Sequence, residues 1–260
     1  MNKGICIYTY IPVRKEPSEA SEMVSQILFG ETYNILEYYQ KWANIELDFD
    51  GYMGWIDRKL LYLIDEQRLS WLQRVNSFVF NIPLCIAHQK NRNSSQYILA
   101  GSNLYEIHGK KFSLFDKTFQ TTEPLTNNKQ KNTHKVVCET AMALLNTPYL
   151  WGGRSTFGID CSGFVQTLFK IAGKNLLRDT RQQAKLGVPV KSLVESIPGD
   201  VAFFENEEGK IVHTGILLSK NEIIHASGYV HIDPIDDNGI FNSERKEYSH
   251  KLSLIRRMIE

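Results

Sequence analysis

The sequence predicts an α+β fold for its C-terminal half, with two small β-barrels in front of that half. In the C-terminal half, helix-forming segments come first and runs typical of antiparallel strands follow. The N-terminal half contains short runs rich in β-branched and aromatic residues, and turn-forming dipeptides separate them. A length of 260 residues also favours two or three compact units over a single domain.

Residues 1–64 are predicted to form the first barrel. Its strands are the runs Val24–Phe29, Thr32–Tyr39, Trp42–Leu47 and Tyr52–Ile56. Asp50-Gly51 between the last two runs is a strong hairpin signal. The segment resembles a bacterial SH3 domain through the motifs Val13–Pro17, Gly30-Glu31, Trp42 and Asp50–Ile56.

Residues 75–122 are predicted to form the second barrel. Its strands are the runs Phe78–Phe80, Leu84–Ala87, Tyr97–Ala100, Leu104–Ile107 and Lys111–Phe115. This segment resembles a second, more divergent bacterial SH3 domain that lacks the Gly-Trp pair of the first. The polar stretches 65–73, with a helical turn, and 124–132 are predicted to separate the domains.

Residues 133–260 are predicted to form the last domain. A helix runs from Thr133 to about Asn146, and a second helix starts at Cys161 and stops at Gly173. Strands are predicted near Asp200–Phe204, Ile211–Leu218, Glu222–Ala226 and Lys251–Arg257. This is also the order of elements in papain-like folds, where a helix carries the nucleophile and the sheet carries its base.

Cys161 is the most informative residue, because it begins a predicted helix directly after a glycine-rich loop. The positive end of a helix dipole and its unpaired N–H groups favour a thiolate, which is the nucleophilic form. A cysteine nucleophile needs a nearby base and a group that orients the base, and His213 and His225 follow in predicted strands. The pattern indicates a cysteine hydrolase.

The relation between the two histidines depends on the loop between their strands. A three-residue loop at 219–221 makes His213 and His225 diagonal neighbours on one face, whereas a two-residue loop puts them on opposite faces. On one face, His213 acts as the general base and His225 holds its tautomer. Zinc binding by Cys161, His213 and His225 is the alternative, but no close ligand pair nucleates such a site, so no metal is expected.

The composition excludes several classes of function. Lys and Arg total 30 against 29 Asp and Glu, so no general attraction to nucleic acid is expected. No apolar run approaches the ~20 residues of a membrane span. Cys6, Cys85 and Cys138 lie in apolar patterns, so the four cysteines predict no disulfide framework. The expected protein is a monomer, cytoplasmic as written, or periplasmic or exported if a signal peptide was removed.

The C-terminal motifs resemble those of the NlpC-type cell-wall cysteine peptidases, which have a papain-like fold. The matching segments are Tyr149–Gly153, Asp160–Phe164, Gly199–Val201, Val212–Ile216 and Ile224–Ser227. With SH3 domains in front, the chain resembles the γ-D-glutamyl-L-diamino acid endopeptidases, which cleave peptidoglycan stem peptides between γ-D-Glu and the diamino acid. The resemblance implies Cys161 as nucleophile, His213 as base, His225 as its orienting residue and the Tyr149 hydroxyl in the oxyanion hole, without a cofactor.

The resemblance also implies how the substrate L-Ala-γ-D-Glu-diamino acid is held. An acid and a tyrosine from the first barrel bind the L-Ala ammonium in that family, and Glu16 and Tyr52 match those positions best. The remaining residues expected to contact the substrate are Trp151, Asp160, Ser162, Asp179 and Thr180. Two alternatives stay open: an amidase, other amide hydrolase or acyltransferase of the same fold, and a non-catalytic protein that binds the cell wall.

Overall fold

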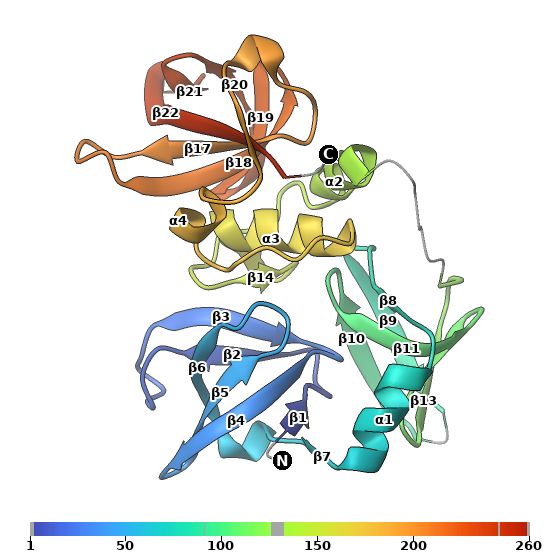
Figure 1. Ribbon diagram of the computed structural model, residues 1–260. Helices are drawn as coiled ribbons and strands as arrows, with labels where there is room; N and C mark the ends of the chain where they lie inside the picture. The colour runs from blue at the N-terminus through green and yellow to red at the C-terminus, as the bar shows by residue number, and fades with distance from the viewer. Residues whose placement is uncertain (1–2, 91, 126–132, 244, 259–260) are drawn as a thin grey trace. The chain divides into compact units, whose positions relative to one another are not determined.

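The computed structural model describes residues 3–90, 92–125, 133–243 and 245–258 (Figure 1). The chain divides into two compact units, residues 1–129 and residues 130–260. Most of the predicted linker at 124–132 lies outside the described residues. None of the described helices is both long and apolar enough to cross a bilayer.

The first sheet of the N-terminal unit has seven strands in the order β3-β2-β6-β5-β4-β1-β7. They are β1 (Lys3–Ile5), β2 (Tyr10–Arg14), β3 (Met23–Leu28), β4 (Thr32–Tyr39), β5 (Trp42–Leu47), β6 (Met53–Asp57) and β7 (Leu63–Ile64), with a 3₁₀ turn η1 (Arg58–Leu60). The four strands predicted between residues 24 and 56 are confirmed to within one residue at each end. Alternate residues of these strands, such as Val13, Ile27 and Ile45, point into one buried cluster.

The second sheet of this unit has six strands in the order β10-β9-β13-β12-β11-β8. They are β8 (Ser77–Val79), β9 (Leu84–Gln89), β10 (Ser95–Leu99), β11 (Asn103–His108), β12 (Lys111–Leu114) and β13 (Lys117–Thr121), after helix α1 (Glu66–Arg74). Phe29 of the first segment packs edge-on against Phe112 and Phe119 at 5.8 Å between ring centroids. The two sheets therefore share part of a core, and the second sheet as a separate SH3-like barrel stays a prediction.

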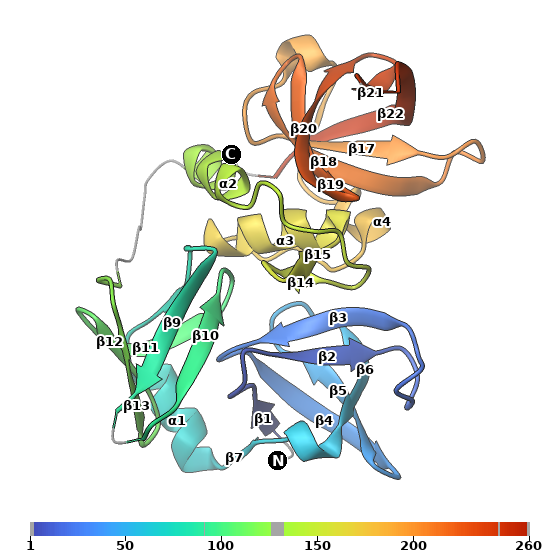
Figure 2. The ribbon, with the colours of Figure 1, turned by 180° about the vertical axis from the view of Figure 1, so that it is seen from behind.

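The C-terminal unit places its helices before its sheet, as an α+β domain does (Figures 1 and 2). The helices are α2 (Thr133–Ala143), α3 (Cys161–Ile171), α4 (Thr180–Gln183) and the 3₁₀ turn η2 (Leu193–Glu195). The first helix ends three residues before the predicted Asn146, because Asn146 adopts a left-handed backbone with φ 66°. Gly173, with φ +87°, follows α3 as the predicted stop.

The sheet of this unit closes on itself, which the sequence did not predict. Its strands are β16 (Val188–Val190), β17 (Val201–Glu205), β18 (Ile211–Ser219), β19 (Glu222–Ser227), β20 (Tyr229–Asp236), β21 (Gly239–Asn242) and β22 (Glu247–Arg257), and β14 (Arg154–Ser155) and β15 (Gly158–Ile159) form a separate pair. The order is β16-β22-β17-β18-β19-β20-β21, and β21 also pairs with β22. The predicted strands are all present, but β20 and β21 complete a barrel.

Two buried clusters hold this barrel in place. One fills the barrel and contains Phe204, Leu217 and Ile223. The other lies between the barrel and the helices, where Phe164 and Leu168 of α3 pack with residues of β17 to β20. Successive residues near the end of β18 face opposite sides, because Leu217 belongs to the barrel cluster and Ile216 to the cluster beside the helices.

Candidate active site

Cys161 is the first residue of α3, as predicted, and its side chain is 7% exposed. Asp160 is the N-cap of this helix, and its carboxylate accepts a hydrogen bond from the Gly163 N–H at 2.7 Å. The Cys161 sulfur lies 3.9 Å from the hydroxyl oxygen of Thr180, the first residue of α4. Thr180, predicted to contact the substrate, therefore lies beside the predicted nucleophile.

The carboxylate of Asp160 is fully engaged inside the protein. Arg178 donates to both of its oxygens, at 3.0 and 2.6 Å, and the Gly152 N–H donates to it at 2.9 Å. The Ser162 hydroxyl donates to Asp160 at 3.3 Å and accepts from Arg178 at 2.8 Å. These contacts fix the loop before α3. They help to position Cys161, and the predicted contacts of Asp160 and Ser162 with the substrate stay predictions.

The loop before α3 also depends on close backbone approaches. A Cβ atom at Gly163 would lie 2.2 Å from the Gly153 carbonyl oxygen, and one at Gly153 would lie 2.2 Å from the Gly158 carbonyl oxygen. Such distances exclude any larger residue without movement of the backbone. The glycine-rich composition of the motif is therefore a packing requirement for bringing this loop against α3.

His213 and His225 are neighbours on one face, as the sequence predicted for one of two registers. Nε2 of His213 lies 2.9 Å from Nδ1 of His225, and both residues are buried. The loop between β18 and β19 has only two residues, but a bulge between Leu217 and Ser219 restores the register in which Gly215 pairs with His225. A Cβ atom at Gly215 would lie 2.8 Å from the Cβ atom of His225, so glycine makes room for this pair.

Sequence reasoning missed three residues around this pair. Asp233 lies 3.2 Å from Nε2 of His225 and 3.1 Å from Nε2 of His231, both measured to Oδ2. The His250 ring stacks on the His213 ring at 4.1 Å between centroids. The spacing of His231 and Asp233 could have indicated them, because residues two apart lie on the same face of a strand. In the sheet, His231 pairs directly with His225.

The hydrogen bonds fix the tautomers of the histidine pair. The Asp233 carboxylate can only accept, so Nε2 of His225 carries the proton and Nδ1 of His225 accepts from His213. His213 therefore carries its proton on Nε2, and its Nδ1 is left with a lone pair. That nitrogen has the form a general base requires, and Asp233 determines it through His225.

Contacts through α4 connect the start of α3 with the start of β18. Thr180 touches Cys161, and the next residue, Arg181, donates to the Ile211 carbonyl oxygen at 3.3 Å. Ile211 lies two residues before His213, and α3 packs against β18. Within the described part of the chain, no hydrogen bond joins the Cys161 sulfur to His213, and catalytic contacts of this kind often tighten only when substrate binds.

Burial sets the protonation of both groups. It raises the pKa of the Cys161 thiol to about 11, with Asp160 adding to the rise and Thr180 and Arg178 opposing it. Burial also lowers the pKa of His213 well below its usual value, and the neighbouring His250, His225 and His231 add to this effect. Both shifts favour the uncharged forms, and at Cys161 this opposes the thiolate that the helix dipole favours.

Tyr149, Trp151 and Asp179 surround the start of α3. Tyr149 is half-buried, and burial, with the negative charge of Asp160 adding to it, raises its pKa, which keeps its hydroxyl protonated. Trp151 is 61% exposed on the loop before α3. Asp179 is the N-cap of α4, and its N–H donates to the Gln182 side chain at 3.2 Å. Their contacts with substrate stay predictions.

Glu16 and Tyr52 belong to the N-terminal unit, so their predicted contact with the substrate stays a prediction. Glu16 is exposed on the loop after β2, and its N–H donates to the Ser21 hydroxyl at 2.9 Å. Tyr52 is partly buried and directly precedes β6. Antiparallel pairing of Arg14 with Trp55 places the end of β2 and the start of β6 at the same end of this barrel.

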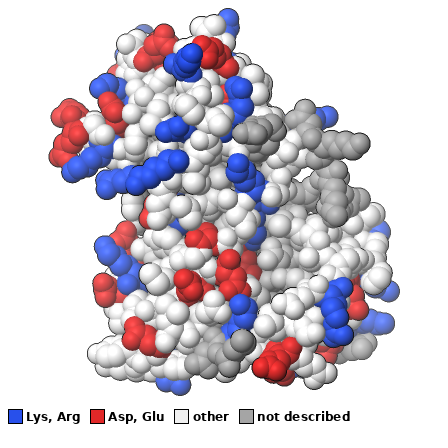
Figure 3. Space-filling view, viewed as in Figure 1, with Lys and Arg blue, Asp and Glu red and all other residues white. Residues whose placement is uncertain are grey.

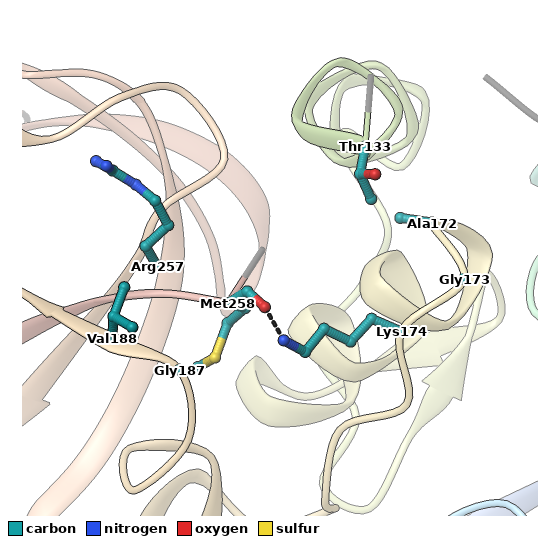
Figure 4. A pocket seen from close by; sticks show the side chains of 8 residues that line it. All are labelled: Thr133, Ala172, Gly173, Lys174, Gly187, Val188, Arg257 and Met258. Atoms are coloured by element: carbon teal, nitrogen blue, oxygen red, sulfur yellow. Dashed lines mark hydrogen bonds between the residues drawn. The ribbon is translucent and has the colours of Figure 1, made fainter. Parts of the chain in front are cut away.

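Two pockets lie among the described residues of the C-terminal unit. A cavity of about 820 Å³ lies against the histidine cluster and is lined by residues of β19, β20 and β22, among them His225, His231 and Asp233. A smaller pocket of about 360 Å³ lies at the opposite end of α3 from Cys161, where Lys174 donates to the Met258 carbonyl oxygen (Figure 4). None of the residues predicted for the active site lines the smaller pocket. Acidic and basic side chains are interspersed on the face shown in Figure 3, in keeping with the balanced charge of the chain.

Comparison with known families identifies two domains. Residues 146–249 match the NlpC/P60 family, and residues 13–61 match the bacterial dipeptidyl-peptidase SH3 domain. The matched ranges contain Tyr149, Cys161, His213 and His225 in the first case, and Glu16 and Tyr52 in the second. In chain order, a bacterial SH3 domain is therefore followed by an NlpC/P60 peptidase domain.

Individual relatives share both parts of this organisation. The chain is 27% identical over 218 residues to the γ-D-glutamyl-L-lysine dipeptidyl-peptidase of Bacillus subtilis, covering 78% of this chain and 71% of that protein. It is 25% identical over 246 residues to dipeptidyl-peptidase 6 of Lysinibacillus sphaericus, covering 85% and 88%. The crystal structure of an NlpC/P60 family protein from Bacillus cereus shares the fold, with a TM-score of 0.84, 18% identity and coverage of 99% and 100%.

Proposed function

We propose that this protein is a cysteine peptidase that hydrolyses the bond between γ-D-Glu and the diamino acid in peptidoglycan stem peptides. The observation that carries the proposal is Cys161 at the start of α3 in an NlpC/P60 domain whose His213–His225 pair is buried and hydrogen-bonded. The two relatives named as dipeptidyl-peptidases support the choice of bond.

The chemistry follows from the protonation of the site. Nδ1 of His213 takes the thiol proton while the Cys161 sulfur attacks the γ-carbonyl carbon of D-Glu, so the thiolate forms only during attack. The Cys161 N–H, which has no partner within the helix because it lies at the N-terminus, and the Tyr149 hydroxyl donate to the developing oxyanion. His213 then protonates the leaving amine, and water hydrolyses the thioester.

Glu16 and Tyr52 are proposed to bind the free ammonium of the N-terminal L-Ala. An acid held for an ammonium is left unpaired when the amine is acylated, which disfavours such substrates. The enzyme would then act on stem peptides already released from glycan, a specificity that suits recycling or scavenging of murein peptides. This assignment rests on the matched SH3 domain and on the position of both residues at one end of its barrel.

The alternatives are distinguished by the bond that is cut. The stem tetrapeptide L-Ala-γ-D-Glu-meso-diaminopimelate-D-Ala and its lysine counterpart are each incubated with the full chain, and the products are identified by mass spectrometry. The proposal predicts L-Ala-D-Glu and the dipeptide of the diamino acid with D-Ala. Release of D-Ala, or cleavage only of a muramoyl-L-Ala bond, would favour another amide hydrolase of this fold. A stable tetrapeptide, together with an N-acetylmuramoyl tetrapeptide that is also left intact, would favour the non-catalytic alternative.

A further inference from the structure

A cluster of three metal-ligating side chains lies behind the histidine pair. His225, His231 and Asp233 each offer one ligand atom, and these atoms lie within 4.8 Å of one another. All three line the cavity of about 820 Å³ in the C-terminal unit. The side chains of His231 and Asp233 are 18% and 12% exposed, so an ion can reach them from that cavity.

The contact between His231 and Asp233 calls for a positive charge, which either a second proton on His231 or a metal ion supplies. Nδ1 of His231 lies 2.8 Å from the Tyr229 carbonyl oxygen, which can only accept, so Nδ1 carries the proton. A neutral His231 then directs the lone pair of Nε2 at the carboxylate oxygen of Asp233, 3.1 Å away. Two lone pairs at this distance repel each other. The contact is favourable only with a second proton on His231 or with a metal ion shared by both atoms.

The distances also fit a metal. Ligand atoms at zinc bond lengths of about 2.0–2.1 Å stand roughly 3.3 Å apart in a tetrahedral site. Oδ2 of Asp233 lies 3.2 Å from Nε2 of His225 and 3.1 Å from Nε2 of His231. Two of the three distances between ligand atoms are therefore close to those of a tetrahedral zinc site. Imidazole and carboxylate groups are also common zinc ligands.

We propose that His225, His231 and Asp233 form a binding site for Zn²⁺ or a similar divalent transition-metal ion, and that its occupation switches the peptidase off. The switch rests on the function proposed above, whereas the site itself does not. An ion bound at Nε2 of His225 displaces the proton from that nitrogen, and the neutral ring then carries it on Nδ1. His225 donates to Nε2 of His213, the proton of His213 moves to Nδ1, and His213 can no longer accept the thiol proton of Cys161.

Binding is tested on the full-length Cys161→Ala protein, because this variant removes the competing thiol. Titration calorimetry with ZnCl₂ is expected to show one equivalent bound. His231→Gln in the same background is expected to weaken binding at least about tenfold, because even residues that only support a ligand contribute that much. His108→Gln, at an exposed histidine of the N-terminal unit, is the matched control and is expected to change nothing. An absence of binding with zinc in excess, or binding unaffected by His231→Gln, would overturn the site.

The switch is tested on proteins that keep Cys161, with cleavage of L-Ala-γ-D-Glu-meso-diaminopimelate as the readout. Zinc is expected to inhibit the wild type, and His231→Gln, measured against its own rate without zinc, is expected to require at least tenfold more zinc for the same fractional inhibition. Equal inhibition of both proteins would mean that zinc acts elsewhere, at the thiol for example, and would refute the switch. If neither protein cleaves the peptide, the proposed function fails, while calorimetry still decides on the site.

Discussion

His213 and His225 are buried imidazoles whose protons are placed by a carboxylate outside the pair. Asp233 accepts from His225, His225 accepts from His213, and the lone pair at Nδ1 of His213 is the result. Asp233 thereby becomes a positioning residue for a base that it does not touch. The proposed chemistry therefore depends on Asp233 as well as on the two histidines, because Asp233 sets the tautomers of both rings.

Asp233→Asn is predicted to lower kcat for tripeptide cleavage at least tenfold with little change in KM. An amide nitrogen facing His225 would donate to it, reverse both tautomers and leave Nδ1 of His213 protonated. The analogous change costs roughly 10⁴-fold where the carboxylate contacts the base itself. Steady-state kinetics measure the effect, and thermal unfolding with the midpoint of the wild type would exclude a general loss of structure. An unchanged kcat would contradict the relay.

Acidification is predicted to destabilise the C-terminal unit below about pH 6.5. Burial lowers the pKa of His213 and of His225, so the unfolded chain binds protons at these residues that the folded chain does not. Stability therefore falls as the pH drops from the unfolded pKa of about 6.5 toward the folded values, by roughly 1.4 kcal/mol per pH unit for each such histidine. Thermal unfolding between pH 7.5 and 5 measures this slope, and His213→Gln is expected to reduce it. A slope identical in both proteins would be inconsistent with a buried neutral His213.

The sequence predicted the residues of this site that belong to a recognisable motif. It did not predict the residues that come close only because β20 pairs with β19. Cys161 was placed by helical spacing after a glycine-rich loop, and the histidine pair by strand alternation. His231 and Asp233 were missed because β20 combines polar residues with Pro234 and does not read as a strand. The burial of Cys161, which raises the pKa of its thiol and opposes the effect of the helix dipole, is likewise not visible in a local pattern.

The N-terminus of α3 is the element on which the position of Cys161 depends. Asp160 caps this helix and forms a buried ion pair with Arg178, whose side chains are 9% and 2% exposed. The glycines of the preceding loop allow the chain to approach the helix closely. Removing one partner of such a pair leaves an uncompensated buried charge.

Arg178→Met is predicted to destabilise the C-terminal unit by about 3–5 kcal/mol. The double variant Asp160→Asn/Arg178→Met is expected to recover part of this loss, since no buried charge then remains. Urea unfolding followed by circular dichroism provides the measurement. Lys135→Met is the control, because the Lys135–Glu139 pair is exposed and contributes at most about 0.5 kcal/mol. Equal effects of Arg178→Met and Lys135→Met would show that the buried pair does not hold this helix start.

The elements that sequence reasoning could not predict are those that depend on pairing between distant strands. Strands with clear β-rich runs, such as β4, β5 and β18, were placed within a residue or two. The bulge between Leu217 and Ser219 sets the register of the histidines, and nothing in the local pattern distinguishes it from a longer loop. The pairing of β21 with β22 closes the barrel, and no local sequence pattern indicates this pairing either.

At the scale of the whole molecule, the SH3 domain is proposed to restrict the substrate. N-acetylation of L-Ala in the tripeptide is predicted to lower kcat/KM about 10²-fold or more, because Glu16 would lose its ammonium partner. Glu16→Gln is expected to reduce this discrimination below tenfold, whereas Glu19→Gln on the same exposed loop serves as the control. Equal cleavage of the free and acetylated peptides by the wild type would remove the SH3 domain from substrate selection.

The measurement that tests the account most directly is the rate of cleavage of L-Ala-γ-D-Glu-meso-diaminopimelate by the wild type, Cys161→Ala, His213→Ala and Cys138→Ala. The predicted result is release of L-Ala-D-Glu by the wild type and by Cys138→Ala at similar rates. Cys161→Ala and His213→Ala are each expected to lose about 10³-fold or more, because the nucleophile and its base act as one unit. Cleavage by Cys161→Ala at the rate of the wild type would contradict a cysteine peptidase built on this site.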